Sequence, residues 1–315
     1  MRGDGPGGRL RQGADDPSAQ PGRVRALVQQ LFGETALKCR RSPGRGARAT
    51  FLVDTPRRRL VVRLSSLPPA ASHREAAVLE ACRAQGLPVP RVLHIGAAGT
   101  GLHAVVLERL PGEPLEPARF PEPGGSADPV AAAGGLLARL HRIEVRGFGP
   151  LVGPLQGAFP DWAPVVDLWR PVVDAASGEP FRSLGVATRE VEGRMERLAG
   201  WTRPAAARLL HGDFKLEHVL VQDGAISGLI DLECALSGDP LWDLARWSTF
   251  EPAPEVWDRF LGGYGSGLPG DLGVRLALYR IRQSVEIGLH ALSRGDRHRL
   301  AQVKRNLERD LRRTA

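Results

Sequence analysis

The sequence predicts an α+β protein in two parts, a sheet-rich first part and a mainly helical second part. Short β-leaning runs gather before residue 110, and apolar residues at helical spacing dominate after it. The segment PGEPL, which begins at Pro111, interrupts both patterns. The 315 residues exceed what one core usually holds, because single cores stop growing at about 250–300 residues. We therefore expect a disordered tail over 1–22, an N-terminal domain over 23–110 and a C-terminal domain over 111–315.

In the N-terminal domain we expect two helices and five antiparallel strands. Apolar residues at helical spacing predict a first helix over 23–32 that ends at Gly33. A capping-box pattern, from Ser72 to Glu75, predicts a second helix that runs to about Gln85 and packs on the sheet. Turn-forming segments such as SPGRGAR and TPRRR separate the β-leaning runs. The strands are expected near 36–39, 49–54, 60–64, 91–95 and 102–108.

In the C-terminal domain the pattern is mainly helical and contains one small group of strands. The last two of these strands are joined by a turn at Asp223-Gly224 and form a short β-hairpin. The strands are expected at 208–210, 219–222 and 226–230. Helices are expected over 129–141, parts of 161–200, 241–250, 255–261, 271–292 and 296–312.

Composition indicates a globular protein rather than a membrane, fibrous or disulfide-rich one. Hydrophobic residues make up 42% and charged residues 25% of the chain, which is ordinary for a soluble domain. No run approaches the roughly 18 apolar residues of a membrane span, and the first residues contain no apolar signal core. We therefore expect a cytoplasmic protein with no membrane partner. Three widely spaced cysteines predict reduced, buried thiols; they are Cys39, Cys82 and Cys234.

The net charge of +8 does not by itself indicate a nucleic-acid partner. All but three of the 43 basic residues are Arg, and the sequence contains no helix-turn-helix or RNA-binding signature. We expect no nucleic-acid partner. Residues 1–75 carry a net charge of +9, 76–270 one of −7 and 271–315 one of +6. This separation suits a protein that binds a polyphosphate in one part and a polar or cationic molecule in another.

One segment of the second part carries a dense pattern of polar residues. LHGDFKLEHVLV (210–221) is followed by GLIDLE (228–233) and then by GDPLWDLA (238–245). These three blocks resemble the aminoglycoside phosphotransferase family, whose signature is HGDxxxxN, a hairpin that ends in Asp-x-Asp/Glu, and GDPxxDLA. The resemblance extends over about 23–246. It implies a protein-kinase-like two-lobed fold, with an N-lobe of five antiparallel strands plus a helix and a mainly helical C-lobe that carries a short catalytic β-hairpin.

The chemistry of phosphoryl transfer assigns roles to residues in these blocks. The reaction needs an aligned acceptor hydroxyl, metal ions, and cations around the transferring group. Asp213, which comes just after a strand, is expected to orient the hydroxyl and accept its proton. Asp231, at the end of a hydrophobic strand, is expected to bind Mg²⁺, and Glu233, two residues on, to point to the same side and assist. By resemblance to protein kinases with an HRDLK segment, Lys215 is expected to face the γ-phosphate of ATP.

His218 stands where the family has a metal-binding Asn. Imidazole suits Mg²⁺ less well than an amide oxygen, although macrolide phosphotransferases are similar in having His here. Three roles stay open for His218: a metal ligand, a ligand through water, or a hydrogen-bond partner of Asp213. We expect His211 to be a buried structural histidine, and Asp239 and Asp243 to anchor the loop and a helix start.

The resemblance also implies a nucleotide-binding set in the N-lobe. Arg63 falls on the strand position of the phosphate-binding lysine, although Arg and Lys are not interchangeable. Its expected partner on the helix is Glu75. Gly44 and Gly46, in the turn SPGRGAR, are expected to cover the phosphates. The segment VVLERLPGEPL resembles the hinge, which implies nucleotide contacts from Glu108, Arg109 and Leu110.

The sequence therefore predicts an ATP- and Mg²⁺-dependent enzyme that moves the γ-phosphate to a hydroxyl of a small polar molecule. An aminoglycoside-like antibiotic or related natural product is the expected acceptor. A metabolic kinase acting on choline, homoserine, a sugar or a macrolide is one alternative, and a nucleotide-binding pseudokinase is another, because His218 and Arg63 replace usual ligands. Acidic residues over 145–200 suit a cationic acceptor; they are Asp161, Asp167, Asp174, Glu179, Glu190, Glu192 and Glu196.

Overall fold

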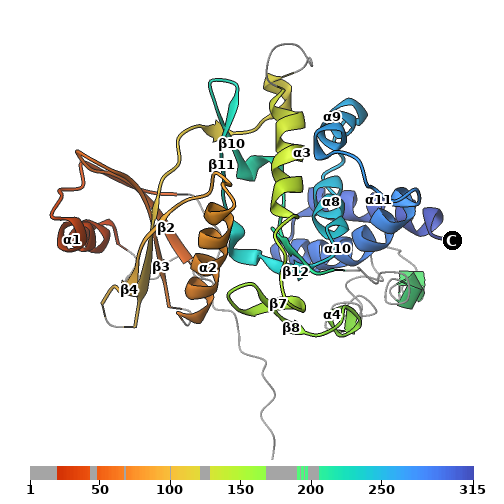
Figure 1. Ribbon diagram of the computed structural model, residues 1–315, viewed down its shortest axis with the longest axis horizontal. Coiled ribbons are helices and arrows are strands. Elements are labelled where there is room, and N and C mark those ends of the chain that lie inside the picture. Colours follow the sequence, from red (N-terminus) through yellow and green to blue (C-terminus); the bar gives the residue numbers. More distant parts are fainter. Residues whose placement is uncertain are drawn as a thin grey trace, which may run out of the picture. The chain divides into compact units, whose positions relative to one another are not determined.

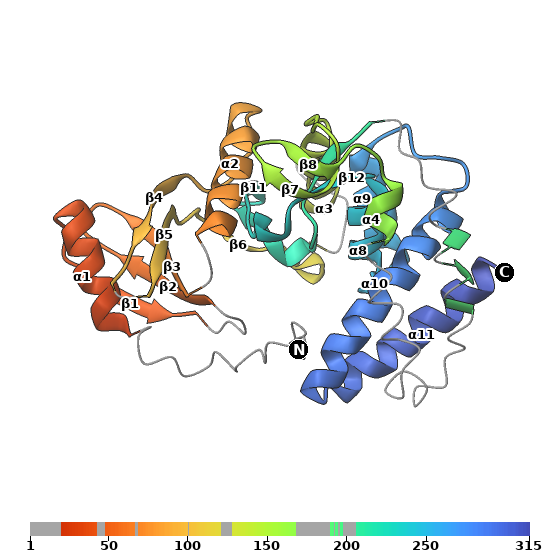
Figure 2. The same cartoon turned by 90° about the horizontal axis from the view of Figure 1, so that it is seen from below.

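The protein consists of two compact units, shown with their elements in Figures 1 and 2. The first unit comprises Met1–Ala76 and Pro90–Leu110, and the second comprises Ala77–Val89 and Pro111–Ala315. Helix α2 (Ala70–Ala84) contributes its first half to one unit and its second half to the other. The computed structural model describes residues 20–42, 48–66, 69–99, 101–120, 128–167, 190–191, 193–194, 196–197 and 206–315.

The first unit is an antiparallel sheet of five strands in the order β1-β2-β3-β5-β4, with helix α1 (Pro21–Phe32) packed on it. Val24 and Val28 of α1 are fully buried in the same core as Phe51. All five predicted strands are confirmed, with bounds that differ by one or two residues. They are β1 (Lys38–Arg41), β2 (Arg48–Asp54), β3 (Arg59–Ser65), β4 (Val92–Ala97) and β5 (His103–Glu108).

The ends of α1 follow ordinary helix chemistry. Pro21 begins the helix, because proline's fixed φ and missing N–H are tolerated in the first turn. Residues 21 and 22 therefore belong to the fold, and the tail predicted over 1–22 is too long at this end. Residues 1–19 lie outside the described residues. Gly33 ends the helix with a left-handed φ of 67°, as predicted.

The predicted capping box at the start of α2 is wrong. The helix begins at Ala70, so Ser72 lies inside it and cannot be its N-cap. The Ser72 hydroxyl is buried and lies 2.9 Å from His103 Nε2 on β5. Glu75 likewise uses its carboxylate on β3, where Arg63 Nη1 donates to Glu75 Oε1 at 2.6 Å. Both side chains of the pattern serve the packing of helix on sheet.

The helices of the second unit pack in pairs. α3 lies beside α9, and α10 lies beside α11 (Figures 1 and 2). Asp128 joins the first pair, because it accepts a hydrogen bond from Val130 N at the start of α3 and pairs with Arg259 of α9 at 2.6 Å. The helices are α3 (Pro129–Leu140), α4 (Ala163–Asp167), α8 (Leu241–Ser248), α9 (Pro254–Tyr264), α10 (Leu272–Arg294) and α11 (Arg297–Arg313).

The second unit has two small sheets, where one group of strands was predicted. The predicted hairpin pairs β10 with β11, but β9 belongs to the other sheet, beside β12. The four unpredicted strands are short or contain Gly and Pro, which weaken a strand pattern, and β6 lies within the segment PGEPL that was read as a break. One sheet contains β6 (Glu113–Pro114), β10 (Val219–Gln222) and β11 (Ala225–Leu229); the other contains β7 (Phe148–Gly153), β8 (Gln156–Phe159), β9 (Arg208–Leu210) and β12 (Leu236–Gly238).

Two further expectations concern the whole chain. None of the helices in the described residues is both long enough and apolar enough to cross a bilayer.

The three cysteines are free thiols. Cys82 is buried as predicted, whereas Cys39 is half-buried and Cys234 is exposed, so the expectation of buried thiols is wrong for Cys234 and only partly met at Cys39.

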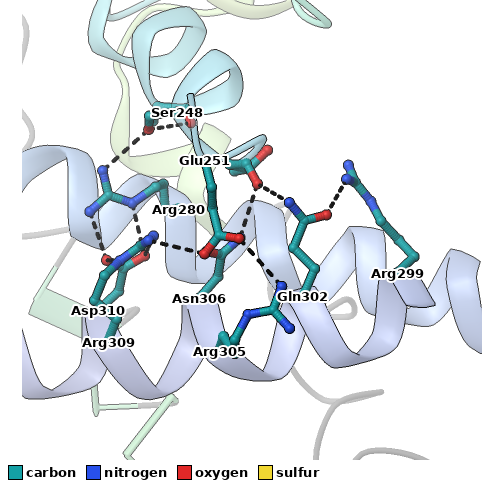
Figure 3. A network of polar contacts seen from close by, with 11 residues as sticks. Ser248, Glu251, Arg280, Arg299, Gln302, Arg305, Asn306, Arg309 and Asp310 are labelled. Atoms are coloured by element: carbon teal, nitrogen blue, oxygen red, sulfur yellow. Dashed lines mark hydrogen bonds and ion pairs between the residues drawn. The ribbon is translucent and has the colours of Figure 1, made fainter. Parts of the chain in front are cut away.

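A buried polar network holds α10 and α11 together (Figure 3). Arg280 of α10 donates from Nε and Nη2 to the two carboxylate oxygens of Asp310 on α11, at 2.8 and 2.7 Å. Arg280 Nη1 also donates to Ser248 Oγ at 3.2 Å. The Asp310 side chain is fully buried and that of Arg280 is 8% exposed. Such a pair stabilises a protein little more than apolar packing would, but its disruption leaves an unpaired buried charge.

We predict that Asp310→Ala lowers the free energy of unfolding by about 3–5 kcal/mol, because Arg280 then stays buried without its carboxylate. Urea unfolding of the full chain measures this change. Asp271→Ala is the control: Asp271 is the N-cap residue of α10, where its side chain makes no capping hydrogen bond, and it pairs with Arg275 near the surface, so its loss should cost about 0.5 kcal/mol. Equal effects of the two substitutions would contradict the role of the buried pair.

Candidate active site

The loop that contains Asp213 connects β9 to β10 and is shaped by a glycine. Gly212 has a φ of 85°, a left-handed conformation that favours glycine. A Cβ atom at this position would lie 2.0 Å from the carbonyl oxygen of Cys234. The close approach brings the loop against the segment that follows Asp231. Glycine at this position in HGD is therefore required by the backbone, and not by the chemistry.

Asp243 of α8 anchors this loop. Its fully buried carboxylate accepts hydrogen bonds from His211 N to Oδ2 at 2.7 Å and from Gly212 N to Oδ1 at 2.9 Å. The anchoring role predicted for Asp243 is thus confirmed. His141, just after α3, lies with Nε2 3.0 Å from Asp243 Oδ2. Sequence reasoning missed His141, because its partner lies 102 positions away and no local pattern connects them.

His211 connects the loop to the strand that precedes Asp231. Its ring is buried, and Nε2 lies 2.9 Å from the carbonyl oxygen of Ile230. His211 also stacks on His218, with ring centroids 5.4 Å apart and an interplanar angle of 17°. The predicted structural role of His211 is confirmed, because both contacts hold neighbouring segments together.

Asp239 has the second predicted anchoring role. Its Oδ1 accepts a hydrogen bond from Leu241 N at the start of α8, at 2.9 Å, and its Oδ2 accepts one from the Tyr279 hydroxyl of α10, at 2.8 Å. Burial raises the pKa of the Asp239 carboxyl above its usual value, and these two hydrogen bonds oppose the rise. Asp239 thus fixes the start of the helix that carries Asp243.

Asp213, the predicted catalytic carboxylate, is paired with an arginine that sequence reasoning missed. Arg246 of α8 contacts Asp213 Oδ1 through Nε at 2.7 Å and through Nη2 at 2.6 Å. The Asp213 side chain is 25% exposed. Burial raises the pKa of Asp213, but the charges of Arg246 and Lys215 outweigh it, so the pKa lies below its usual value and the group is an anion at neutral pH.

Lys215, the second predicted catalytic residue, lies beside Asp213. Its Nζ is 3.4 Å from Asp213 Oδ2 and 2.8 Å from Glu217 Oε1. Burial lowers the pKa of Lys215, but the hydrogen bond to Glu217 and the charge of Asp213 raise it by more. The pKa therefore lies above its usual value and the ammonium stays charged. The structure thus brings Asp213 and Lys215 together.

Asp231 and His218 also lie close to each other. His218 Nε2 is 3.4 Å from Asp231 Oδ2. The backbone of Asp231 is left-handed, with φ 67° and ψ 46°, a conformation uncommon for a residue other than glycine and frequent at functional sites. Burial, and then the nearby His211, lower the pKa of His218 to about 4, so its imidazole is neutral at pH 7.

The argument that placed Glu233 on the same side as Asp231 is wrong. It relied on the alternation of side chains along a strand, but β11 ends at Leu229 and residues Leu232–Cys234 form a short 3₁₀ helix. Glu233 is an exposed residue of that helix.

The residues near Asp231 fit a magnesium ion that is held mainly by a nucleotide. The described residues contain no group of three or more His, Cys, Asp or Glu side chains able to hold a metal. Mg²⁺ at a nucleotide site needs only one or two carboxylates, because phosphate oxygens and water complete its shell. The Asp231 side chain, 37% exposed, offers such a carboxylate, and the neutral His218 lies beside it.

The predicted nucleotide set is only partly within the described residues. The ion pair between Arg63 and Glu75 is present, with both side chains largely buried. Gly44 and Gly46 lie outside the described residues. In the predicted hinge, Glu108 N donates to Arg91 O and Arg109 N donates to Arg59 O, both at 2.9 Å, so these two amides are already used by the sheet.

The side chains of the hinge segment also have partners of their own. Arg109 pairs with Asp54 of β2. Glu108 and Arg109 line a cavity of about 300 Å³ together with the arginines at the start of β3 and β4; its lining residues are Arg57, Arg58, Arg59, Leu60, Arg91, Leu93, Glu108 and Arg109.

Most of the acidic residues predicted to bind a cationic acceptor lie outside the described residues. Asp161, Glu190 and Glu196 are exposed. Asp174, Glu179 and Glu192 lie outside the described residues, as does the side chain of Asp167.

The chain belongs to the phosphotransferase enzyme family, whose family model matches residues 40–279. The match includes the three blocks from which the resemblance was drawn, and it shows that the protein is a phosphotransferase. Among its relatives, the hygromycin-B 4-O-kinase of Escherichia coli is 26% identical over 271 residues, which cover 82% of this chain and 76% of that protein.

Solved structures confirm the predicted protein-kinase-like fold. The apo form of a thermostable mutant of aminoglycoside phosphotransferase APH(4)-Ia has a TM-score of 0.76 at 19% identity, covering 93% of this chain and 99% of that chain. A ternary complex of that protein with AMP-PNP and hygromycin B has a TM-score of 0.74 at 19% identity, covering 92% and 98%. The macrolide 2′-phosphotransferase MphH from Brachybacterium faecium has a TM-score of 0.60 at 19% identity, covering 90% and 97%.

We predict that His218 makes the stability of the protein depend on pH. Because its pKa is about 4 in the folded protein and about 6.5 when unfolded, the unfolded chain takes up a proton first as pH falls. The free energy of unfolding should therefore decrease as pH falls from 6.5 towards 4, by about 3 kcal/mol in all. Urea unfolding at several pH values should show this slope in the wild type and a smaller slope in His218→Asn.

The control for this prediction is His298→Asn, because His298 is exposed and its replacement should leave the slope of stability against pH unchanged. Parallel curves for the wild type and His218→Asn would show that burial does not lower the pKa of His218.

Proposed function

We propose that the protein is an ATP-dependent kinase that transfers the γ-phosphate to a hydroxyl group of a small polar molecule, and that an aminoglycoside-like compound is the acceptor. The observation that carries the proposal is the Asp213 carboxylate. It is ionised, partly exposed, held by Arg246 and adjacent to Lys215. A carboxylate in this state can orient a hydroxyl and receive its proton.

The reaction assigns a separate task to each group. The acceptor oxygen attacks the γ-phosphorus, its proton passes to Asp213, and the bond to the bridging oxygen breaks so that ADP leaves with the electron pair. Lys215 contributes a positive charge to the transferring phosphoryl group. This division of tasks needs only a weak base, because the transition state of phosphoryl transfer is loose. The lowered pKa of Asp213 is therefore compatible with its role.

In this proposal Asp231 binds Mg²⁺, with His218 beside it as a neutral second ligand, direct or through water, and with Glu233 as a more distant assistant. The metal would neutralise charge on the phosphates of the nucleotide. Two features support the assignment, namely the left-handed backbone of Asp231 at the end of the hairpin and the 3.4 Å between its Oδ2 and His218 Nε2.

The first unit is proposed to bind the nucleotide. Arg63, held by Glu75 in the sheet, would contact phosphate oxygens with a fixed guanidinium, and Gly44 and Gly46 would cover the phosphates. Of the three hinge residues, Glu108 and Arg109 have their amides bonded within the sheet. Within the described residues the amide of Leu110 has no such acceptor, so Leu110 is the proposed backbone donor to the base.

Two observations favour an amine-bearing acceptor. Cys234 is exposed as a residue, but the surroundings of its sulfur raise the pKa of the thiol to about 11, first by desolvation and then through the carboxylates of Glu233, Asp213, Asp231 and Glu286. These four carboxylates are candidate partners for the ammonium groups of an acceptor, although Asp213 and Glu286 already pair with Arg246 and Arg282. The second observation is the relationship to a protein named hygromycin-B 4-O-kinase.

The proposed function is tested by ADP release in the presence of Mg-ATP and a panel of acceptors. The panel contains hygromycin B, other aminoglycosides, macrolides, fructosamines, choline and homoserine, and mass spectrometry identifies any phosphorylated product. We expect transfer to one or more aminoglycosides. Transfer only to a neutral acceptor would contradict the acceptor class, and absence of transfer with Mg-ATP bound would favour a pseudokinase.

We predict that Asp213→Asn lowers kcat by about a hundredfold or more, because an amide cannot accept the proton of the hydroxyl. ATP affinity and the thermal midpoint should stay close to those of the wild type. Asp271→Asn, at the partly exposed N-cap of α10, is the matched control and should retain full activity. Near-normal turnover in Asp213→Asn would remove this residue from the mechanism.

We predict that Asp231→Ala weakens the binding of Mg-ATP by about tenfold or more, equivalent to about 1.4 kcal/mol, and abolishes transfer. Isothermal titration with and without Mg²⁺ measures the effect. Binding of metal-free ATP should change little, which separates loss of the metal from loss of the nucleotide site. Glu233→Gln is the control and should cost much less. Unchanged affinity for Mg-ATP in Asp231→Ala would contradict the metal assignment.

A further inference from the structure

Helix α8 contacts the loop around Asp213 twice. Asp243 and Arg246 are three positions apart, so they lie on one face of the helix. Asp243 fixes the backbone before Asp213 through the amides of His211 and Gly212. Arg246 then reaches the carboxylate of Asp213 itself. A single helical turn thus fixes both the backbone and the side chain of the predicted catalytic residue.

The contacts of Arg246 hold one carboxylate oxygen of Asp213 more closely than the other. Nε of Arg246 donates a hydrogen bond to Oδ1 at 2.7 Å, and Nη2 of the same guanidinium forms an ion-pair contact with Oδ1 at 2.6 Å. In the described part of the chain, the ion-pair contact of Oδ2 is the longer one to Nζ of Lys215, at 3.4 Å. A carboxylate whose Oδ1 is held by a charge-assisted hydrogen bond and a second close guanidinium nitrogen cannot rotate freely about its Cβ–Cγ bond.

We propose that Arg246 is a positioning residue that holds Oδ1 of Asp213 so that Oδ2 is the oxygen presented to the acceptor hydroxyl. The inference rests on the proposed function, because it assigns the geometry of the same reaction. The proton of the hydroxyl then goes to Oδ2 as the new oxygen–phosphorus bond forms. Arginine suits this task better than lysine, since its planar guanidinium holds Nε and Nη2 in a fixed relation, both within 2.7 Å of Oδ1.

The surroundings of the guanidinium keep it in place. Arg246 Cζ lies 5.8 Å from the centroid of the Phe250 ring, and its side chain is only 19% exposed. Arg299 of α11 lies over the same ring, with Cζ 4.6 Å from the centroid. Its side chain donates to Gln302 and has no hydrogen bond or ion pair with Asp213 in the described part of the chain. Arg299 is therefore a matched control, with the same charge and the same aromatic neighbour but only a longer-range electrostatic interaction with the carboxylate.

The first test uses steady-state kinetics of the full chain with Mg-ATP and hygromycin B, or the acceptor that the panel identifies. Arg246→Ala should lower kcat by roughly a hundredfold, the cost of a misplaced reacting group, with little change in KM for ATP. Guanidinium chloride added to this variant should restore part of the lost kcat. Arg246→Lys should fall between wild type and Arg246→Ala, and Arg299→Ala should stay close to wild type.

Three results would overturn the inference: near-normal kcat in Arg246→Ala, equal losses of kcat in Arg246→Ala and Arg299→Ala, or failure of guanidinium to rescue a variant that is folded. Thermal denaturation establishes folding. If Arg246→Ala does not fold, Arg246→Lys carries the test, since a wild-type kcat in Arg246→Lys would contradict the need for a planar guanidinium beside Oδ1.

A second test does not depend on activity. The other titratable groups whose charges are coupled to Asp213 include Lys215, His218, Cys234 and Arg299, and all but Arg299 are kept in both variants. The titration of the Asp213 carboxyl, followed by carbon-detected NMR, should move to higher pH in Arg246→Ala and move less in Arg299→Ala, because Arg299 makes no hydrogen bond or ion pair with the carboxylate in the described part of the chain. An unchanged titration in Arg246→Ala would overturn the inference. If the wild type transfers phosphate to no acceptor, the proposed function fails, while this titration still decides whether Arg246 holds Asp213.

Discussion

The burial of the Asp243 carboxylate is the constraint on which the described site depends. A buried carboxylate is costly unless it is hydrogen-bonded, and Asp243 meets this requirement with the amides of His211 and Gly212 and with the ring of His141. These bonds tie two different segments to α8: the loop before Asp213 and the residue just after α3. The same hydrogen bonds that stabilise the buried Asp243 carboxylate also hold the loop in one conformation. The position of Asp213 therefore depends on the hydrogen bonds of Asp243.

Charge balance around Asp213 sets the kind of chemistry that it can perform. Arg246 and Lys215 keep the carboxylate ionised, which makes it a poor base but a well-oriented acceptor of a hydrogen bond. For a loose transition state, orientation and electrostatic stabilisation are worth more than basicity. The same cations that weaken Asp213 as a base favour the approach of phosphate. The site therefore combines an arginine–carboxylate pair with a lysine, and both support transfer of an anionic group.

Two residues differ from the family signature, His218 and Arg63, and each contacts neighbouring side chains in a way that fits a kinase. His218 stacks on His211 and is neutral because it is buried, so it can stand beside a metal without adding a positive charge. Arg63 keeps the ion pair with Glu75 that a lysine would make, at the cost of a bulkier and more rigid cation. Neither residue removes a group that phosphoryl transfer requires, which is why we favour an active kinase over a pseudokinase.

The sequence by itself determined the elements whose signals are local. The strands of the first sheet, the helices from α8 to α11, and the anchoring roles of His211 and Asp243 were predicted from periodicity and from the resemblance of three blocks. The errors have several causes. The side chain of Ser72 has its partner, His103, 31 positions away. The alternation at Glu233 fails because β11 ends at Leu229 and a 3₁₀ helix follows, and the missed strands β6, β7, β8 and β12 are short or contain Gly and Pro. Only the tertiary structure paired Arg246 with Asp213 and His141 with Asp243, because side chains 33 and 102 positions apart meet through packing. Periodicity in a single sequence marks which face of an element is buried, but not which distant side chains it meets.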